Sequence, residues 1–236
     1  MVRAIAYRHR LEQLANPVDT EVVRAVLKGI RRQHKVAPAR KDPLRRSPLA
    51  EVVAEIPTDT LTGLRDRAVL LVGFAGAFRR SELVAIDVEH LDFTTDRGVL
   101  VTIPASKTDQ EGAGDTVPLH RAADAALCPV RALRAWLDGG GLTAGPMFRR
   151  MHRGERLGGR LSSQSVALIV KRRARAAGLD PARLAGHSLR AGYTTTAAAL
   201  QVEERKIARV TRHKNLAVLR GYIRPETAFE DSEPVL

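Results

Sequence analysis

The spacing of apolar and polar positions along the 236-residue chain predicts a mainly helical protein. Residues 17–33 repeat apolar side chains at helical spacing, which predicts an amphipathic helix capped by Asp19 or Thr20. Residues 63–78 are apolar on almost every face, as is typical of a buried helix. Further helices are predicted over residues 48–56, 129–141, 161–179, 187–201, 202–213 and 215–222, and a short helix followed by its exit over residues 80–91.

One stretch changes to a period of two, which is the spacing of a half-buried strand. Val99, Val101 and Ile103 alternate with other side chains there, and residues 107–115 supply a polar turn. Residues 97–120 therefore predict a β-hairpin or a small antiparallel sheet. The expected fold class is mainly α with a small antiparallel β-sheet.

Prolines and basic residues interrupt the pattern between residues 34 and 48, which predicts an extended linker. No earlier segment is available to cover the apolar face of helix 17–33. We therefore expect residues 1–35 to be the last helix of an N-terminal domain whose earlier part is missing. Residues 36–47 are then a basic linker, 48–222 a larger domain, and 223–236 an acidic tail suited to protein–protein docking or to plain solvation.

Charge points to a polyanionic partner. The chain has 39 Lys and Arg against 26 Asp and Glu, a net charge of +13, which is typical of nucleic-acid binding. Most of the basic residues are arginines, which grip phosphate bidentately, although a GC-rich genome also favours arginine. The candidate DNA contacts are Arg45 and Arg46 in the linker and Lys171, Arg172 and Arg173 in helix 161–179.

Other function classes find little support. Apolar runs are too short to span a membrane, and the N-terminus lacks the apolar stretch of a secretory signal, so we expect a cytoplasmic, nucleoid-associated protein. A single cysteine, Cys128, excludes an intramolecular disulfide and a cysteine-based metal cluster. We expect a buried structural thiol there and no metal site.

Several chemically capable residues follow one another in a fixed order. His187 and Arg190 share one helix face, a pairing that chance alone would supply. Arg79 stands three residues before Glu82, at the end of a buried apolar helix, where a guanidinium must be paired or face a polar cleft. The full ordered set is Arg79, Lys107, His187, Arg190, His213 and Tyr222.

This order, with the motifs GAFRRSELVAI, SKTDQEGAGDTVPL, GHSLRAG and RHKNLAVLRGYIR, resembles the tyrosine recombinases, or phage integrases, including the Xer- and Cre-like enzymes. The resemblance covers roughly residues 48–225. It implies the DNA breaking-rejoining catalytic domain fold, with residues 1–35 left from a core-binding domain and the tail docking on a neighbouring protomer. It also implies site-specific recombination through a 3′-phosphotyrosyl intermediate, without ATP, metal or another cofactor.

By this resemblance Tyr222 is the nucleophile, and Arg79 and Arg190 hold the phosphate oxygens. Two guanidinium groups suit a pentavalent phosphorus that carries extra negative charge. A phenol with a pKa near 10 needs a cationic surround and a general base, for which His187 is the candidate.

The resemblance assigns three further residues. Lys107 matches the lysine that protonates the leaving 5′-oxygen, His213 a further hydrogen-bond donor to the phosphate, and Glu82 an acidic residue that supports Arg79. Each has an ordinary structural alternative. Arg79 and Glu82 can form a purely structural ion pair, Lys107 can be a solvated turn lysine, and His213 can serve packing alone.

The expected partners are double-stranded DNA and three further copies of the chain on it, the free protein being a monomer. No membrane and no small-molecule substrate are expected. With most of an N-terminal domain absent, DNA binding should be weak and sensitive to salt. Two other functions stay open: topoisomerase-like DNA relaxation with the same phosphotyrosyl chemistry, and a non-catalytic DNA-binding regulator.

Overall fold

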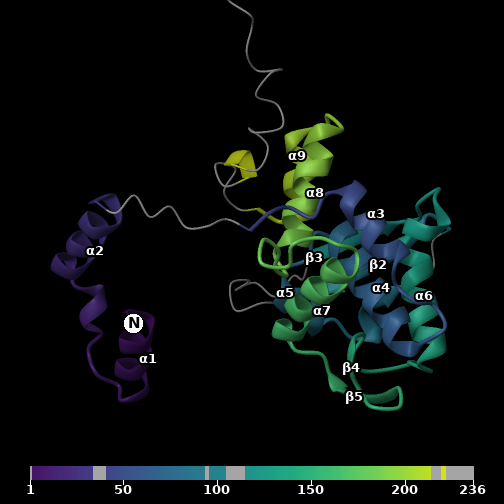
Figure 1. Cartoon of the computed structure of the whole chain (residues 1–236), viewed down its shortest axis with the longest axis horizontal. Helices are drawn as coiled ribbons and strands as arrows, with labels where there is room; N and C mark the ends of the chain where they lie inside the picture. The colour runs from purple at the N-terminus through teal and green to yellow at the C-terminus, as the bar shows by residue number, and fades with distance from the viewer. Residues whose placement is uncertain (1, 34–40, 94–95, 105–114, 214–218, 222–236) are drawn as a thin grey trace, which may run out of the picture. The chain divides into compact units, whose positions relative to one another are not determined.

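The computed structural model describes residues 2–33, 41–93, 96–104, 115–213 and 219–221 (Figure 1). Contacts divide the chain into two compact units, Met1–Arg40 and Lys41–Leu236. Within the described segments, no helix combines the length and the apolar character that crossing a bilayer demands.

The first unit contains two α-helices rather than the single one that the pattern predicted. They are α1 (Val2–Leu11) and α2 (Glu21–Gln33), with a 3₁₀ turn η1 (Pro17–Asp19) between them. The second helix begins at Glu21, directly after Thr20, which is one of its two predicted caps. In the turn before it, the Asn16 side chain accepts the Val18 N–H. α1 was missed because its apolar residues form no strong stripe, and its large apolar side chains Ile5, Tyr7 and Leu11 are exposed in the structure.

The second unit is mainly helical with two small antiparallel sheets, which confirms the predicted fold class. Its elements are α3 (Arg46–Ala54), α4 (Leu61–Ala75), α5 (Arg80–Ala85), η2 (Val88–His90), β1 (Leu91–Asp92), β2 (Gly98–Ile103), β3 (Asp115–His120), η3 (Ala125–Leu127), α6 (Pro129–Gly139), β4 (Arg149–His152), β5 (Arg156–Arg160), α7 (Ser163–Ala176), α8 (Ser188–Ala199) and α9 (Glu204–Thr211).

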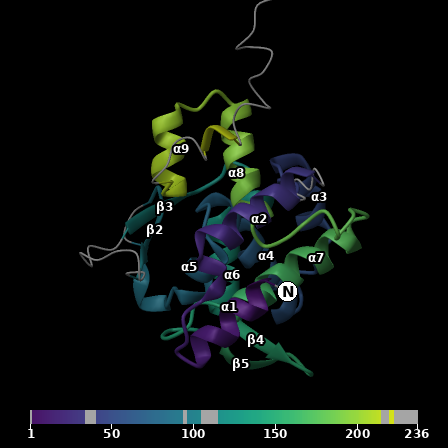
Figure 2. The ribbon, with the colours of Figure 1, turned by 90° about the vertical axis from the view of Figure 1, so that its left-hand side faces the viewer.

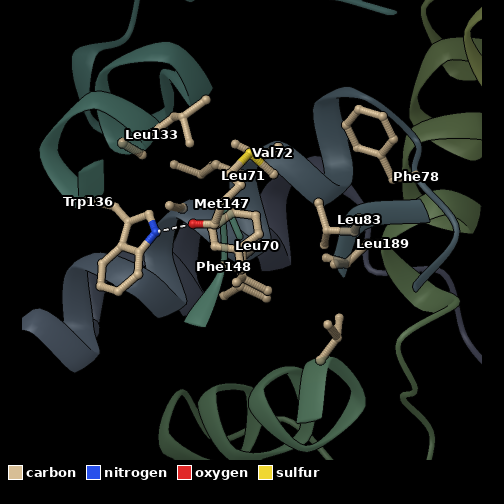
Figure 3. Close-up of a cluster of buried hydrophobic side chains, with 14 of the residues drawn as sticks. Leu70, Leu71, Val72, Phe78, Leu83, Leu133, Trp136, Met147, Phe148 and Leu189 are labelled. Carbon is tan, nitrogen blue, oxygen red and sulfur yellow. Dashed lines mark hydrogen bonds between the residues drawn. The ribbon is translucent and has the colours of Figure 1, made fainter. Parts of the chain in front are cut away.

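α4 forms the centre of this unit, as its apolar sequence predicted. It contacts α3, α6, α7, α8 and β3, so it is buried on several sides. Trp136 of α6 is fully buried against this core, and its indole N–H donates to the Met147 carbonyl at 2.8 Å (Figure 3). Cys128 is also buried, as expected of a structural thiol.

The predicted hairpin is confirmed as β2 paired with β3, and β1 adds a third, edge strand. Val99 lies opposite Leu119 and Val101 opposite Val117, so the alternating residues all face the core. The turn between these strands, residues 105–114, lies outside the described residues.

A second hairpin, β4–β5, was not predicted. Its strands carry arginine, histidine and glycine where a strand pattern needs apolar alternation. At the turn, Gly154 and Glu155 both have positive φ, 71° and 57°. The Glu155 carboxylate accepts from the backbone N–H and the hydroxyl of Thr62, both at 2.7 Å, and so caps the first turn of α4. The hairpin lies at the end of the unit opposite α9 (Figure 2).

The segment before α3 is fixed to α8, the helix that carries the H-x-x-R pair. The Leu44 N–H donates to the Ser188 carbonyl at 2.9 Å. Gly192 permits this crossing, because a Cβ there would lie 1.9 Å from the Leu44 carbonyl oxygen. The compact unit thus begins at Lys41, ahead of the expected domain start at Pro48.

Candidate active site

The turn between α4 and α5 presents Arg79. Phe78 is buried and anchors this turn, and Arg79 follows it as the residue that caps α5. The Arg79 backbone N–H donates to the Glu82 carboxylate at 2.8 Å, and its guanidinium forms an ion pair with the same carboxylate. Nearly half of the Arg79 side chain, 46%, remains exposed. Glu82 therefore fixes Arg79 while leaving it accessible to an anion.

The start of α8 presents His187 and Arg190. His187 is the capping residue and is accessible to solvent. Arg190 is one turn further along the helix and is only 2% exposed, with its Nη1 donating to the Ala77 carbonyl at 2.8 Å. Gly186 lets the Arg80 stem pack beside His187, since a Cβ there would meet the Arg80 Cδ at 2.1 Å.

The end of α9 presents His213. The Thr211 hydroxyl is fully buried, donates to the Ile207 carbonyl at 2.7 Å, and lies 2.8 Å from Nδ1 of His213. Because the Thr211 hydroxyl donates its one proton to the Ile207 carbonyl, its oxygen accepts a hydrogen bond from the Nδ1–H of His213. Thr211 therefore orients the imidazole and turns its Nε2 away from the helix.

The four described residues of the set act on one another electrostatically. Loss of hydration, and then the charges of Arg190, Arg79 and Arg80, lower the pKa of His187. The pKa of His213 falls to about 4 through burial and then through the charges of Arg190, Arg79, His187 and Arg212. Both imidazoles are therefore neutral near pH 7. The α4–α5 turn, the start of α8 and the end of α9 thus come together in one cationic site.

Arg212 is a residue of this place that the sequence prediction missed. Its guanidinium pairs with the Glu82 carboxylate at 2.8 Å, and its side chain is 8% exposed. Burial by itself would raise the pKa of Glu82, but the charge of Arg212 and hydrogen bonds from Arg79 and Arg212 hold it below its usual value. Nothing in the local sequence marks Arg212, because the Ala77 and Glu82 groups that it binds lie 135 and 130 positions away in the chain.

Two residues of the predicted set, Lys107 and Tyr222, lie outside the described residues. The candidate DNA contacts lie on other elements, at the start of α3 and on α7. Arg45 and Arg46 are exposed at the start of α3, and the Arg46 N–H donates to the Thr196 hydroxyl at 3.2 Å.

The remaining candidates are on α7, where two of them bind a buried carboxylate. Asp66 of α4 is fully buried and pairs with Arg172 at 2.5 Å and Arg173 at 2.7 Å, besides its neighbour Arg65. Arg173 is only 15% exposed, so its guanidinium is committed to joining α7 to α4. Lys171 is half-buried and has no such ion pair with Asp66.

A groove of about 760 Å³ runs beside α7. Five basic residues and no acidic residue are among those that line it within the described chain; the basic ones are Arg65, Arg150, Lys171, Arg172 and Arg175. Such a one-sign lining attracts polyanions. In the same described part of the chain, no group of three or more His, Cys, Asp or Glu residues gathers that could hold a metal ion.

Comparison with known proteins gives consistent matches. The sequence profile of the "Phage integrase family" matches residues 43–228. An integrase/recombinase xerD homolog of Selenomonas ruminantium is 42% identical over 218 residues, which cover 92% of this chain and 64% of that relative.

Solved structures share the fold at low sequence identity. XerH site-specific recombinase, in a post-cleavage complex with palindromic difH substrate, matches with a TM-score of 0.62 and 17% identity over 81% of this chain and 50% of that chain. A lambda integrase tetramer bound to a Holliday junction matches with a TM-score of 0.57 and 14% identity over 100% of this chain and 67% of that chain.

The chain spans less than two thirds of the Selenomonas relative and half of the XerH chain. The matching profile nonetheless covers most of the chain, including every segment that builds the site. The chain therefore belongs to the phage integrase family and has the catalytic domain fold of the tyrosine recombinases.

Proposed function

We propose that this chain is a site-specific DNA recombinase that cuts and rejoins DNA through a 3′-phosphotyrosyl intermediate formed on Tyr222. The observation that carries the proposal is the convergence of Arg79, His187, Arg190 and His213 at one cationic place. The likeness to XerH and to the xerD homolog supports the same reaction class.

In the proposed reaction the scissile phosphate occupies the space in front of Arg79 and Arg190. Arg190 is held by the Ala77 carbonyl and Arg79 by Glu82, so neither must reorganise when negative charge grows on the non-bridging oxygens. These fixed charges supply the stabilisation that metal ions supply in other phosphoryl-transfer enzymes.

The proton transfers follow from the ionisation states. The Tyr222 hydroxyl oxygen attacks phosphorus while neutral His187 accepts its proton, since the lowered pKa of His187 leaves its ring nitrogen free to act as a base. The bond from phosphorus to the 5′-oxygen breaks, and Lys107 supplies the proton to the leaving oxygen. The reverse sequence with another strand's 5′-hydroxyl rejoins DNA, so the phosphodiester energy is conserved.

His213 adds a contact whose state changes when DNA binds. Its pKa of about 4 keeps it neutral in the free protein. The extra negative charge of the phosphate in the transition state favours the protonated form of the His213 ring. This form can donate to the phosphate from Nε2 while its Nδ1–H donates to Thr211. His213 would then stabilise the transition state rather than the empty site.

The whole assembly is also proposed. One of the matching structures is a lambda integrase tetramer bound to a Holliday junction. We infer that four copies of this chain act on two duplexes at the nucleoid, with the tail 223–236 docking between protomers. We assign the first unit to part of an N-terminal core-binding domain, which the exposed apolar residues Val22, Val26 and Ile30 of α2 support.

The experiment that tests the proposal is trapping of the covalent intermediate. The chain is incubated with nicked duplexes from a randomised oligonucleotide pool enriched for binding to it, and the products are run on a denaturing gel. We expect a protein–DNA adduct with wild type, with or without EDTA, and none with Tyr222→Phe. An adduct that persists in Tyr222→Phe, or that EDTA abolishes, contradicts the mechanism.

The same preparation separates the competing functions. Strand exchange that requires two enriched sites supports recombination. Relaxation of a supercoiled plasmid without such sites points instead to a topoisomerase-like enzyme. Tight binding of the enriched DNA without any adduct from wild type points to a non-catalytic regulator.

A further inference from the structure

Arg212 occupies the point where α9 ends and the chain turns towards His213. Its backbone is left-handed, with φ 54° and ψ 43°. Helices commonly end on such a residue, and glycine is the usual occupant because other residues are strained there. An arginine at this position implies that its side chain has a task which offsets that strain.

The side chain is directed into the protein and not towards solvent. Nη1 donates to the Gly76 carbonyl at 3.2 Å and Nη2 to the Ala77 carbonyl at 3.1 Å, in addition to the ion pair with Glu82. The guanidinium also lies 5.2 Å from the centre of the Phe78 ring. Nη1 also donates to the Val210 carbonyl in the last turn of α9, at 2.5 Å. The other contacts fall on the turn that presents Arg79 and on the first turn of α5.

Arg212 is linked to Arg79 and to Arg190, in each case through a group that both arginines bind. Glu82 binds Arg79 and Arg212 together. The Ala77 carbonyl accepts from Arg212 and also from Nη1 of Arg190 at 2.8 Å. The Arg212 carbonyl accepts from Nη2 of Arg79 at 3.4 Å. A single residue thus joins the α4–α5 turn, α8 and the end of α9.

We propose that Arg212 is a positioning residue that sets His213 in register with Arg79 and Arg190 around one phosphate. The proposal rests on the proposed function. Arg212 is too buried to bind the phosphate itself, because its side chain is 8% exposed and its Nη1 and Nη2 groups already donate to carbonyl and carboxylate oxygens. It acts on the reaction only through the three residues that it aligns.

Substitution by glycine gives a sharp test, because glycine favours the left-handed backbone but removes the side-chain contacts. With Arg212→Gly we expect adduct formation at saturating nicked duplex to slow by about 100-fold, as sub-ångström alignment is lost. The DNA dissociation constant should stay unchanged. Arg212→Lys should recover part of the rate, since its ammonium still reaches Glu82 but cannot serve both carbonyls.

A matched control is available at the end of α8. Gln201 is exposed and also has a left-handed backbone, with φ 54°. Gln201→Gly makes the same backbone change away from the site, so we expect a wild-type rate. If Arg212→Gly melts below the assay temperature, Arg212→Lys carries the test by a reduced rate at unchanged DNA affinity.

The outcomes separate the two proposals. A wild-type rate in Arg212→Gly or in a folded Arg212→Lys overturns the positioning role and leaves the proposed function standing. A loss confined to DNA affinity also overturns it, because it would make Arg212 a binding residue. Absence of adduct from wild type itself overturns the proposed function, and the positioning role with it.

Discussion

At the scale of single residues, the arginines carry the positive charge of the site, whereas its two histidines stay neutral in the free protein. Arg79 and Arg190 are permanent cations, and each lowers the pKa of both His187 and His213. A neutral imidazole can accept a proton from a phenol, whereas an imidazolium cannot. The arginines therefore bind the phosphate and also keep the proposed base ready to accept.

This arrangement predicts a pH dependence of folding. An unfolded histidine titrates near 6.5, whereas folded His213 titrates at about 4, so the unfolded chain binds more protons between these values. Stability should therefore fall as pH drops below 6.5. We expect the melting temperature to decrease from pH 7.5 to pH 5, and the decrease to be smaller in His213→Gln. An equal decrease in both proteins contradicts the assignment.

At the scale of elements, a buried ion cluster fixes α7 to α4. Asp66 is fully buried, and Arg65 and Arg173 beside it are largely buried. Removing one member of such a cluster leaves the others desolvated and unpaired, which costs more than the pair contributes. α4 also ends at the turn that presents Arg79, so this cluster helps to fix the helix that leads to the site.

We therefore expect Asp66→Asn to lower the free energy of unfolding by about 3–5 kcal/mol, measured by urea denaturation. The matched control is Asp59→Asn, at an exposed position close to the start of α4, where the change should stay within about 0.5 kcal/mol. Equal effects of the two substitutions would show that the cluster does not hold the helices together.

At the scale of the whole molecule, the excess of positive charge is the main attraction for DNA. The net charge is +13, and the groove beside α7 adds a surface lined by basic residues. Each phosphate contact releases counterions from the DNA, so the binding affinity falls with salt more steeply as the number of such contacts rises. The basic residues are not equivalent, because those bound to Asp66 are committed to the fold.

Lys171 lines the groove, and Lys206 instead pairs with Glu203 at the start of α9. We expect Lys171→Ala to reduce the slope of log Kd against log salt by about 0.9, the effect of one lost phosphate contact. Lys206→Ala should leave the slope unchanged. Titrations of a fluorescent duplex at several salt concentrations measure both, and identical slopes in the two variants would remove the groove from the DNA interface.

Whether a feature of the fold could be predicted from the sequence depended on how far apart in the chain its interacting residues lie. Helical periodicity located α4, α6 and α7, since a helical period is set within a few residues. The β4–β5 hairpin was not predicted, because the contact that holds it joins Glu155 to Thr62, 93 positions away in the chain. Its strands carry no apolar alternation that would have marked them.

The sequence by itself determined the α-helices of the second unit, the β2–β3 hairpin, the cationic character and the ordered set of residues that marks the family. Only the tertiary structure decided which arginines are committed to the fold and that Arg212 joins the site. The physical reason is that a buried charge is stable only beside its partner. Arg212 finds Glu82 across 130 positions and Arg172 finds Asp66 across 106, which no local pattern records.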